Sequence, residues 1–158
     1  METALLIITT VLTALLAGVF FGYMVSVNWA LHRLGDREYV RAMQQINIVI
    51  QNGLFFLTFM GPVPLLPVVT YMARDAANPL QFYLLLAASI VYIGGSFILT
   101  IGGNVPYNEK LAKVDADGPA DVVAAARTRY EKPWNAMHAV RTIASIIATV
   151  LLVIACTL

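Results

Sequence analysis

Residues 3–31 read TALLIITTVLTALLAGVFFGYMVSVNWAL, a run of 29 positions that contains no charged side chain. A helix needs about 20 apolar residues to cross the hydrocarbon core of a bilayer, so this run is long enough to span it. Met1 and Glu2 supply no basic segment ahead of the run, which is also far longer than the apolar core of a signal peptide. We therefore predict a retained transmembrane helix at this position.

Three further apolar runs follow the first, at residues 46–72, 80–101 and 134–157. The composition agrees with a membrane protein, because 59% of the 158 residues are hydrophobic and only 12% are charged. In soluble domains about a quarter of residues are charged. The sequence predicts an all-α integral membrane protein, a single domain over residues 1–158 in which four transmembrane helices, at about 4–31 and the three runs above, form a bundle.

The second run contains three prolines, and each removes a backbone donor and clashes with the preceding helical turn. They follow a glycine closely, in the order Gly61, Pro62, Pro64 and Pro67. We predict that this helix bends or breaks between Gly61 and Pro67.

Small residues in two runs predict close contacts between helices. In the first run they recur at every fourth position, at Ala14, Gly18, Gly22 and Ser26. In the third run they are Gly94, Gly95 and Ser96. Such stripes are also consistent with a homo-oligomer.

The segment between the third and fourth runs is the longest outside the membrane. Residues 102–111 are rich in turn-forming and amide residues. Asp117-Gly118-Pro119 is typical of a helix start. We predict a short cytoplasmic helix from there to about Tyr130, with the last span beginning separately near Pro133.

The basic residues predict the orientation of the bundle. Nine of the ten lie in or beside the first and third loops, and only Arg74 lies on the other side. By the positive-inside rule both of these loops are cytoplasmic and both termini are outside, in a multi-pass protein of the cell membrane. A net charge of +1 gives no reason to expect nucleic acid as a partner, so membrane lipids and small lipophilic molecules are the partners expected.

The last span opens with WNAMHAVRT, residues 134–142. Helical spacing places Trp134, His138 and Arg141 on one face, with Asn135 one position off it. An aromatic ring, an imidazole and a fixed positive charge on one face indicate a site. The other interpretation is an interfacial Trp with an Arg that reaches the headgroups.

Other polar residues fall at the same cytoplasmic level of the bundle, near the ends of the other three spans. They are Asn28, His32, Asn47, Gln51, Asn104 and Asn108. If four helices surround one axis, these side chains converge with the face of the last span on a single pocket. The alternative is that the amides bond neighbouring helices. The apolar runs contain no Asp, Glu or Lys, which argues against a proton pump or a charged-substrate transporter.

A metal site is the minor alternative for the same residues. His32, His138 and Glu109 have the composition of a two-histidine, one-carboxylate site. They lie on different elements and without a metal-ligand spacing, so we predict no metal. The single Cys156 excludes a cysteine-based cluster.

Two stretches resemble a known family. Residues 104–111, NVPYNEKL, are followed by a Trp-Asn-x-x-His-x-x-Arg pattern at residues 134–141. This pair resembles the small four-helix membrane family that includes the anthrone oxygenases, which has an Asn-x-Pro-x-Asn segment after its third span and the same start to its fourth. The matching positions are Asn104, Pro106, Asn108, Trp134, Asn135, His138 and Arg141. Asn28, Trp29 and His32 have no counterpart in these patterns.

The resemblance implies oxidation of a phenolic polycyclic anthrone by O2, without a metal or flavin. His138 would take a proton from the acidic central methylene. Arg141 and Asn108, with Asn104, would stabilise the oxyanion, and Trp134 would offer a flat surface. We expect the remaining substrate-binding residues to be Asn135, Asn28, His32, Asn47 and Gln51. O2 would then be the co-substrate, and no cofactor is required.

Two hypotheses remain open at this point. The first is a cofactor-independent membrane monooxygenase that acts on a lipophilic aromatic molecule. The second is a non-enzymatic four-helix protein, an accessory subunit or a lipid- or small-molecule-binding module, in which the polar residues only hold helices together. A pocket of several hundred cubic ångströms lined by His138 and Asn108 would favour the enzyme.

Overall fold

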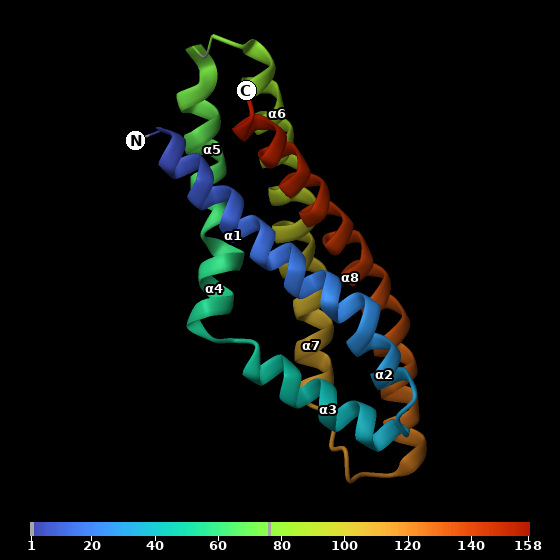
Figure 1. Ribbon diagram of the computed structural model, residues 1–158. Helices are drawn as coiled ribbons and strands as arrows, with labels where there is room; N and C mark the ends of the chain where they lie inside the picture. The colour runs from blue at the N-terminus through green and yellow to red at the C-terminus, as the bar shows by residue number, and fades with distance from the viewer. Residues whose placement is uncertain (1, 76) are drawn as a thin grey trace.

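Four long helices form the molecule in a computed structural model, which describes residues 2–75 and 77–158 (Figure 1). Each is long and apolar enough to cross a membrane, as predicted. Their bounds are Thr3–His32, Gly53–Asp75, Pro79–Ala112 and Ala120–Cys156. The protein is therefore a multi-pass, all-helical membrane protein.

The elements follow one another along the chain with short breaks. The first span comprises α1 (Glu2–Gly22), the π-helical η1 (Tyr23–Val27) and α2 (Asn28–His32). After α3 (Asp36–Val49), the second span comprises α4 (Gly53–Met60), α5 (Pro62–Met72) and the 3-10 turn η2 (Ala73–Asp75). The third comprises α6 (Pro79–Ile90), the π-helical η3 (Val91–Ile98) and η4 (Thr100–Asn104), and α7 (Val105–Ala112). The fourth is α8 (Ala120–Cys156).

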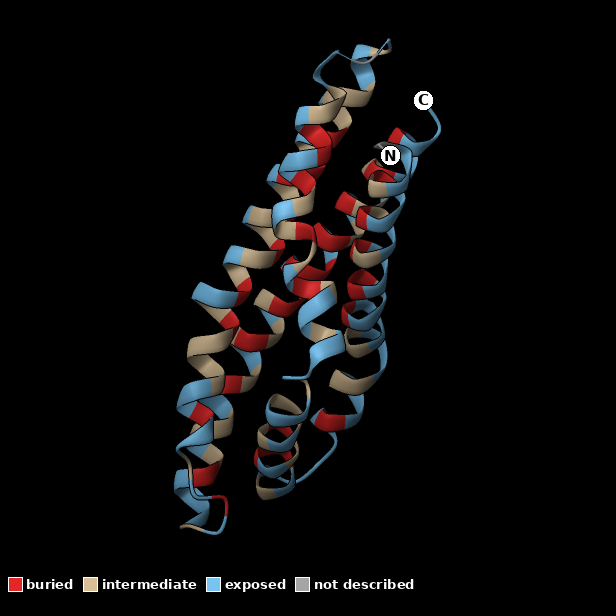
Figure 2. Ribbon diagram, turned by 90° about the vertical axis from the view of Figure 1, so that its left-hand side faces the viewer, coloured by how far each residue is buried: buried red, intermediate tan, exposed pale blue. Residues whose placement is uncertain are grey.

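The spans pack around one axis, with α8 against α1 on one side and against α6 and η3 on the other. α5 closes the ring between α1 and α6. Both termini lie at the same end as the α5–α6 connection, and α3 lies at the opposite end (Figure 1). Buried residues follow the inward faces of the helices, while exposed ones cover the outside (Figure 2).

Two separate apolar clusters fill the bundle. One lies toward the termini and is built on α1, α5, α6 and α8, with Leu16, Leu66 and Tyr92 at its centre. The other, around Tyr39, Met43 and Trp134, joins α3 to α7 and to the first half of α8. The candidate site lies where these two clusters meet.

The second span differs from the prediction, because its helix begins at Gly53 and not at residue 46. Residues 46–49 belong to α3, and the chain turns at residues 50–52. The reason is local, since Asn52 adopts an extended backbone and its side chain accepts a hydrogen bond from the Phe55 N–H, which starts a new helix. The boundary between α4 and α5 falls at Gly61, within the predicted stretch, but the Gly61 backbone keeps helical angles (φ −55°, ψ −47°) and Pro67 lies inside α5.

Two predicted breaks near the site are wrong. The third span does not end at residue 101 but continues through η4 and α7 to Ala112. The short helix ending near Tyr130 and the last span are one helix, α8, which passes through Pro133 without interruption. Pro133 removes one backbone donor from α8, which costs free energy. The burial of Tyr130 and Trp134 on either side of it offsets that cost. Packing thus overrides the local preference for turns.

Of the two groups of small residues, only the one in the third span packs closely against another of the described helices. A Cβ added at Gly95 would lie 2.7 Å from the Cβ of Ala144, and Ser96 Oγ lies 2.9 Å from Ser145 Oγ, so η3 and α8 are in close contact, as predicted. The stripe of α1 is instead exposed at Ala14, Gly18, Gly22 and Ser26, and makes no helix contact within the described chain at its two glycines. Burial follows the large residues of α1 that alternate with the stripe, such as Leu16 and Phe20.

Candidate functional site

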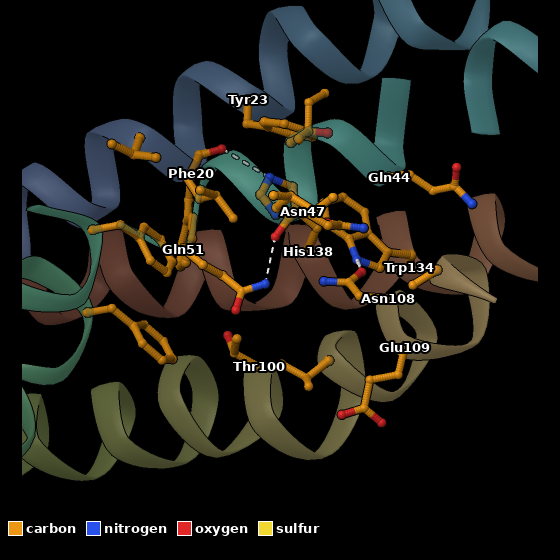
Figure 3. A pocket seen from close by; sticks show the side chains of 18 of the residues that line it. Phe20, Tyr23, Gln44, Asn47, Gln51, Thr100, Asn108, Glu109, Trp134 and His138 are labelled. Atoms are coloured by element: carbon orange, nitrogen blue, oxygen red, sulfur yellow. Dashed lines mark hydrogen bonds between the residues drawn. The ribbon is translucent and has the colours of Figure 1, made fainter. Parts of the chain in front are cut away.

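A cavity of about 590 Å³ lies between the four spans at the end of the bundle that carries α3 (Figure 3). Aromatic rings form much of its wall, from α1, η1, α4 and α8, and polar side chains lie among them. The polar and titratable lining residues are Gln44, Gln45, Asn47, Gln51, Thr100, Asn108, Glu109, His138 and Arg141. A cavity of this size, mostly apolar with a few convergent polar groups, is typical of a small-molecule site.

A chain of hydrogen bonds runs from α8 to the backbone of α1. His138 is buried, with 1% of its surface exposed, and its Nε2 lies 3.1 Å from the carbonyl oxygen of Phe20. Because a carbonyl only accepts, Nε2 carries the proton and donates. Nδ1 then holds a lone pair, which accepts from Arg141 Nε at 3.0 Å and from Nη2 at 2.9 Å. Both nitrogens of a neutral imidazole are therefore engaged.

Arg141 does not reach outward to the headgroups, because only 7% of its surface is exposed. Its guanidinium also donates to Thr100 Oγ1 at 3.3 Å and lies over the rings of Phe20 and Trp134. Within the described residues no carboxylate forms an ion pair with it. A buried charge without a counterion is costly, and neutral acceptors with ring faces compensate it only in part. The cavity thus has a positively charged end.

Three rings on successive turns of α8 form a stack. Trp134 lies parallel to His138, at 5.0 Å and 10° between the rings, and near Tyr130, at 5.9 Å and 23°. Tyr23 from η1 packs against both Trp134 and His138. The predicted shared face of Trp134, His138 and Arg141 is confirmed, and it faces the cavity.

Asn108 on α7 is held by the same stack. Its Oδ1 accepts from Trp134 Nε1 at 2.7 Å and from the Tyr130 hydroxyl at 2.8 Å (Figure 3 shows the bond to Trp134). Asn47 on α3 donates to the Tyr130 hydroxyl over 3.5 Å. Side chains from α3, α7 and α8 are therefore joined at one wall of the cavity.

The predicted convergence is correct for only some of the polar residues. Asn47, Gln51, Asn108, Trp134, His138 and Arg141 all line the cavity. Asn104 and Asn135 do not, although both belong to the sequence pattern. Asn104 is buried beside the cavity and donates to the Trp134 carbonyl oxygen, and its own Oδ1 has no partner among the described residues. The Oδ1 of Asn135 is likewise buried without a partner there.

Asn28 and His32 also lie outside the cavity lining, so their expected place in the pocket is wrong. The side chain of His32 is 71% exposed and its Nδ1 lies 2.7 Å from Glu131 Oε1. In the last turns of the first span, Tyr23 of η1 lines the cavity, and Asn28, which directly follows η1, does not. His32, His138 and Glu109 are not brought together, and no group of three His, Cys, Asp or Glu residues in the described chain is arranged to hold a metal ion.

Sequence reasoning missed four residues of the site. Tyr130 precedes Trp134 by four positions, so the spacing that selected Trp134 and His138 could have found it. Phe20, Tyr23 and Thr100 gave no such signal, because Phe20 acts through its backbone carbonyl and the other two lie in or at the start of π-helical segments. Such segments often mark functional sites, but they are read only from a structure.

Comparison with known proteins gives one match. The family model described as anthrone oxygenase matches residues 55–151, which include α7, the stack on α8 and Arg141. No curated protein and no solved structure matches the chain.

Proposed function

Since the chain belongs to the anthrone oxygenase family, we propose that it is a membrane-embedded oxygenase that oxidises a lipophilic phenolic or polycyclic aromatic substrate with O2. One observation carries the proposal: the buried guanidinium of Arg141 has no carboxylate partner in the described chain and lines a cavity walled by aromatic rings. Such a cavity suits a flat molecule on which negative charge develops during the reaction.

Substrate binding would rearrange the pair of Arg141 and His138. A ketone oxygen that enters the cavity competes with His138 Nδ1 for the donors of Arg141. As enolate character grows on that oxygen, the charge-assisted bonds to Arg141 become stronger than those to a neutral imidazole. The same movement frees the Nδ1 lone pair, which becomes the base. Apo geometry of catalytic groups commonly tightens or changes in this way on binding.

The proton balance closes within the site. His138 Nδ1 takes one proton from the methylene carbon, and the electron pair of that C–H bond becomes the delocalised enolate. The carbanion reduces O2 and forms a C–O bond to a peroxide, which takes the proton back from the imidazolium. Loss of the second C–H proton with cleavage of the O–O bond releases water and leaves a carbonyl. The substrate methylene supplies both hydrogens and all the electrons needed, so this proposal needs no metal or flavin.

A second proposal concerns placement in the cell membrane. The nine basic residues of the first and third loops favour a cytoplasmic position for α3 and the cavity, with both termini outside. Lipophilic substrate would then reach the cavity from the bilayer or from its inner surface, since exposed apolar residues such as Ile48 and Phe56 are part of its lining.

The non-enzymatic hypothesis explains less of the site. Polar groups that only join helices satisfy one another, as Ser96 and Ser145 do. The cavity instead has in its wall a charge that lacks a counterion among the described residues, beside about 590 Å³ of space.

Deuterium exchange without O2 tests the proposed first step on its own. Purified protein in detergent is mixed anaerobically with anthrone in D2O, and deuterium in the methylene is followed by NMR. We expect wild type to accelerate exchange above the buffer rate and His138→Gln to lose that acceleration. Exchange at the buffer rate with wild type would contradict the proposal.

A further inference from the structure

The amide of Asn108 has only one chemically allowed orientation. Trp134 Nε1 can donate but never accept, and it lies 2.7 Å from one terminal atom of the Asn108 side chain. That atom must be the oxygen, which fixes the nitrogen as the other terminal atom. The assignment rests on the chemistry of the indole and does not depend on a choice between two similar fits.

Two donors fill the acceptor capacity of that oxygen. The Tyr130 hydroxyl donates to Asn108 Oδ1 at 2.8 Å, in addition to the indole N–H, and a carbonyl oxygen has two lone pairs. The Tyr130 oxygen in turn accepts from Asn47 Nδ2, so its own proton is directed to Asn108. The side chains of Asn108, Trp134 and Tyr130 thus form a lock, in which the indole N–H and the hydroxyl proton both point to Asn108 Oδ1.

The remaining group is the NH2 of Asn108, which has no hydrogen-bond partner in the described part of the chain. The polar side-chain atoms there that are both buried and without a partner are Asn104 Oδ1 and Asn135 Oδ1, so the Asn108 NH2 is accessible. Asn108 lines the cavity, and in Figure 3 its nitrogen points to the interior, on the side of Gln51 and Thr100. Two fixed N–H donors therefore face the space that a ligand would fill.

We infer that Asn108 selects ligands that carry an oxygen acceptor, through its NH2 group, and that Tyr130 is a positioning residue that locks this amide together with Trp134. The inference rests on the proposed function for the class of ligand and adds to it a second oxygen contact, on α7, besides the one to Arg141 on α8. Hydrocarbon ligands of the same shape gain nothing from this contact.

Binding of two matched probes tests the inference without turnover. The probes are 1,8-dihydroxyanthraquinone and anthracene, which share three fused rings and differ in their oxygens. Quenching of Trp134 fluorescence reports binding in a Trp29→Phe background, because the chain has only two tryptophans and Trp29 is 67% exposed on the surface.

Asn108→Asp keeps the acceptor for Trp134 and Tyr130 and replaces the donors with an oxygen. We expect it to weaken quinone binding at least about tenfold and to leave anthracene binding within about twofold. Tyr130→Phe should weaken quinone binding by about three- to tenfold with the same selectivity, since one of the two anchors remains. Tyr107→Phe is the matched control on α7, because its hydroxyl makes no hydrogen bond with any described residue and it does not line the cavity. Both probes should bind this variant as they bind wild type.

Equal effects on both probes, or no effect of Asn108→Asp on the quinone, would overturn the inference. The outcome is separable from that of the proposed function. Selective loss of quinone binding in a protein that never consumes O2 would support the lock and remove the oxygenase. Turnover that persists while the variants bind both probes without selectivity would support the oxygenase and remove the lock.

Discussion

Arg141 directs two N–H donors, from Nε at 3.0 Å and Nη2 at 2.9 Å, at the single lone pair of His138 Nδ1. This contact makes each residue the resting partner of the other. Arg141 covers the lone pair of His138 Nδ1, and that lone pair gives the buried cation one of its few acceptors. In the proposed mechanism, a substrate oxygen that binds Arg141 would expose this lone pair in the same movement, which would couple recognition to proton abstraction.

His138→Gln should remove the base and keep the structure. A glutamine amide can donate to the Phe20 carbonyl and accept from Arg141, but it cannot hold the substrate proton. We expect turnover to fall by about 10²–10⁴ with a small change in melting temperature. His138→Ala should lose activity and also stability, since it leaves a buried void and removes an acceptor from Arg141. Wild-type turnover in His138→Gln would exclude His138 as the base.

Arg141→Met should abolish turnover and raise the melting temperature. Methionine keeps an unbranched apolar side chain and removes a buried charge that has no counterion in the described chain. Replacing such a charge by an apolar group is often stabilising. For a chain of this size each kcal/mol gained corresponds to about 2–4 °C, measured by differential scanning fluorimetry in detergent. Arg141→Lys should retain part of the activity, because it keeps the charge and loses the planar fork. A strongly destabilised Arg141→Met would mean that Arg141 is structural.

Gly95→Ala should destabilise the bundle by about 1–3 kcal/mol, because its Cβ would lie 2.7 Å from that of Ala144. The neighbouring Gly94 is the control. No atom lies within 4 Å of its added Cβ, so Gly94→Ala should be neutral or slightly stabilising. Thermal unfolding of both variants in the same detergent gives the comparison, and equal melting temperatures would show that the η3–α8 contact is looser than described.

Asp117→Cys in a Cys156→Ala background tests the orientation. Asp117 lies in the connection between α7 and α8 and forms an exposed ion pair with Arg41. The positive-inside rule predicts that a membrane-impermeant maleimide added to intact cells does not label it, and that it is labelled after permeabilisation. Efficient labelling in intact cells would reverse the proposed topology.

The sequence was sufficient for the number of spans and for the cavity-facing side of the last one, because both follow from local patterns. Runs of apolar residues define membrane helices, and the spacing of Trp134, His138 and Arg141 defines a face. The helix boundaries near the site were not predictable in this way. Pro133 and the glycines at 102–103 favour a break in isolation, and the packing of α8 against α3, η4 and α7 opposes it.

Side-chain partners were predictable to a smaller extent. Asn104, Asn108 and Asn135 look alike in sequence, yet only Asn108 lines the cavity. Asn135 is on α8, one position off the face of Trp134. Between Asn104 and Asn108 the difference follows from the π-helical turns of η4, which change the angular position of the residues after them in the same helix. Asn28 was misplaced for the same reason, since η1 precedes it directly.

Oxygen consumption by the purified protein with anthrone is the most direct test of the central claim. It is followed with an oxygen electrode while anthraquinone is quantified by chromatography, with His138→Gln and heat-inactivated protein as controls. We expect uptake well above the spontaneous rate, one O2 consumed for each quinone formed, and loss of the excess rate in His138→Gln. Uptake at the spontaneous rate with folded wild-type protein and several hydroxylated anthrones would contradict it.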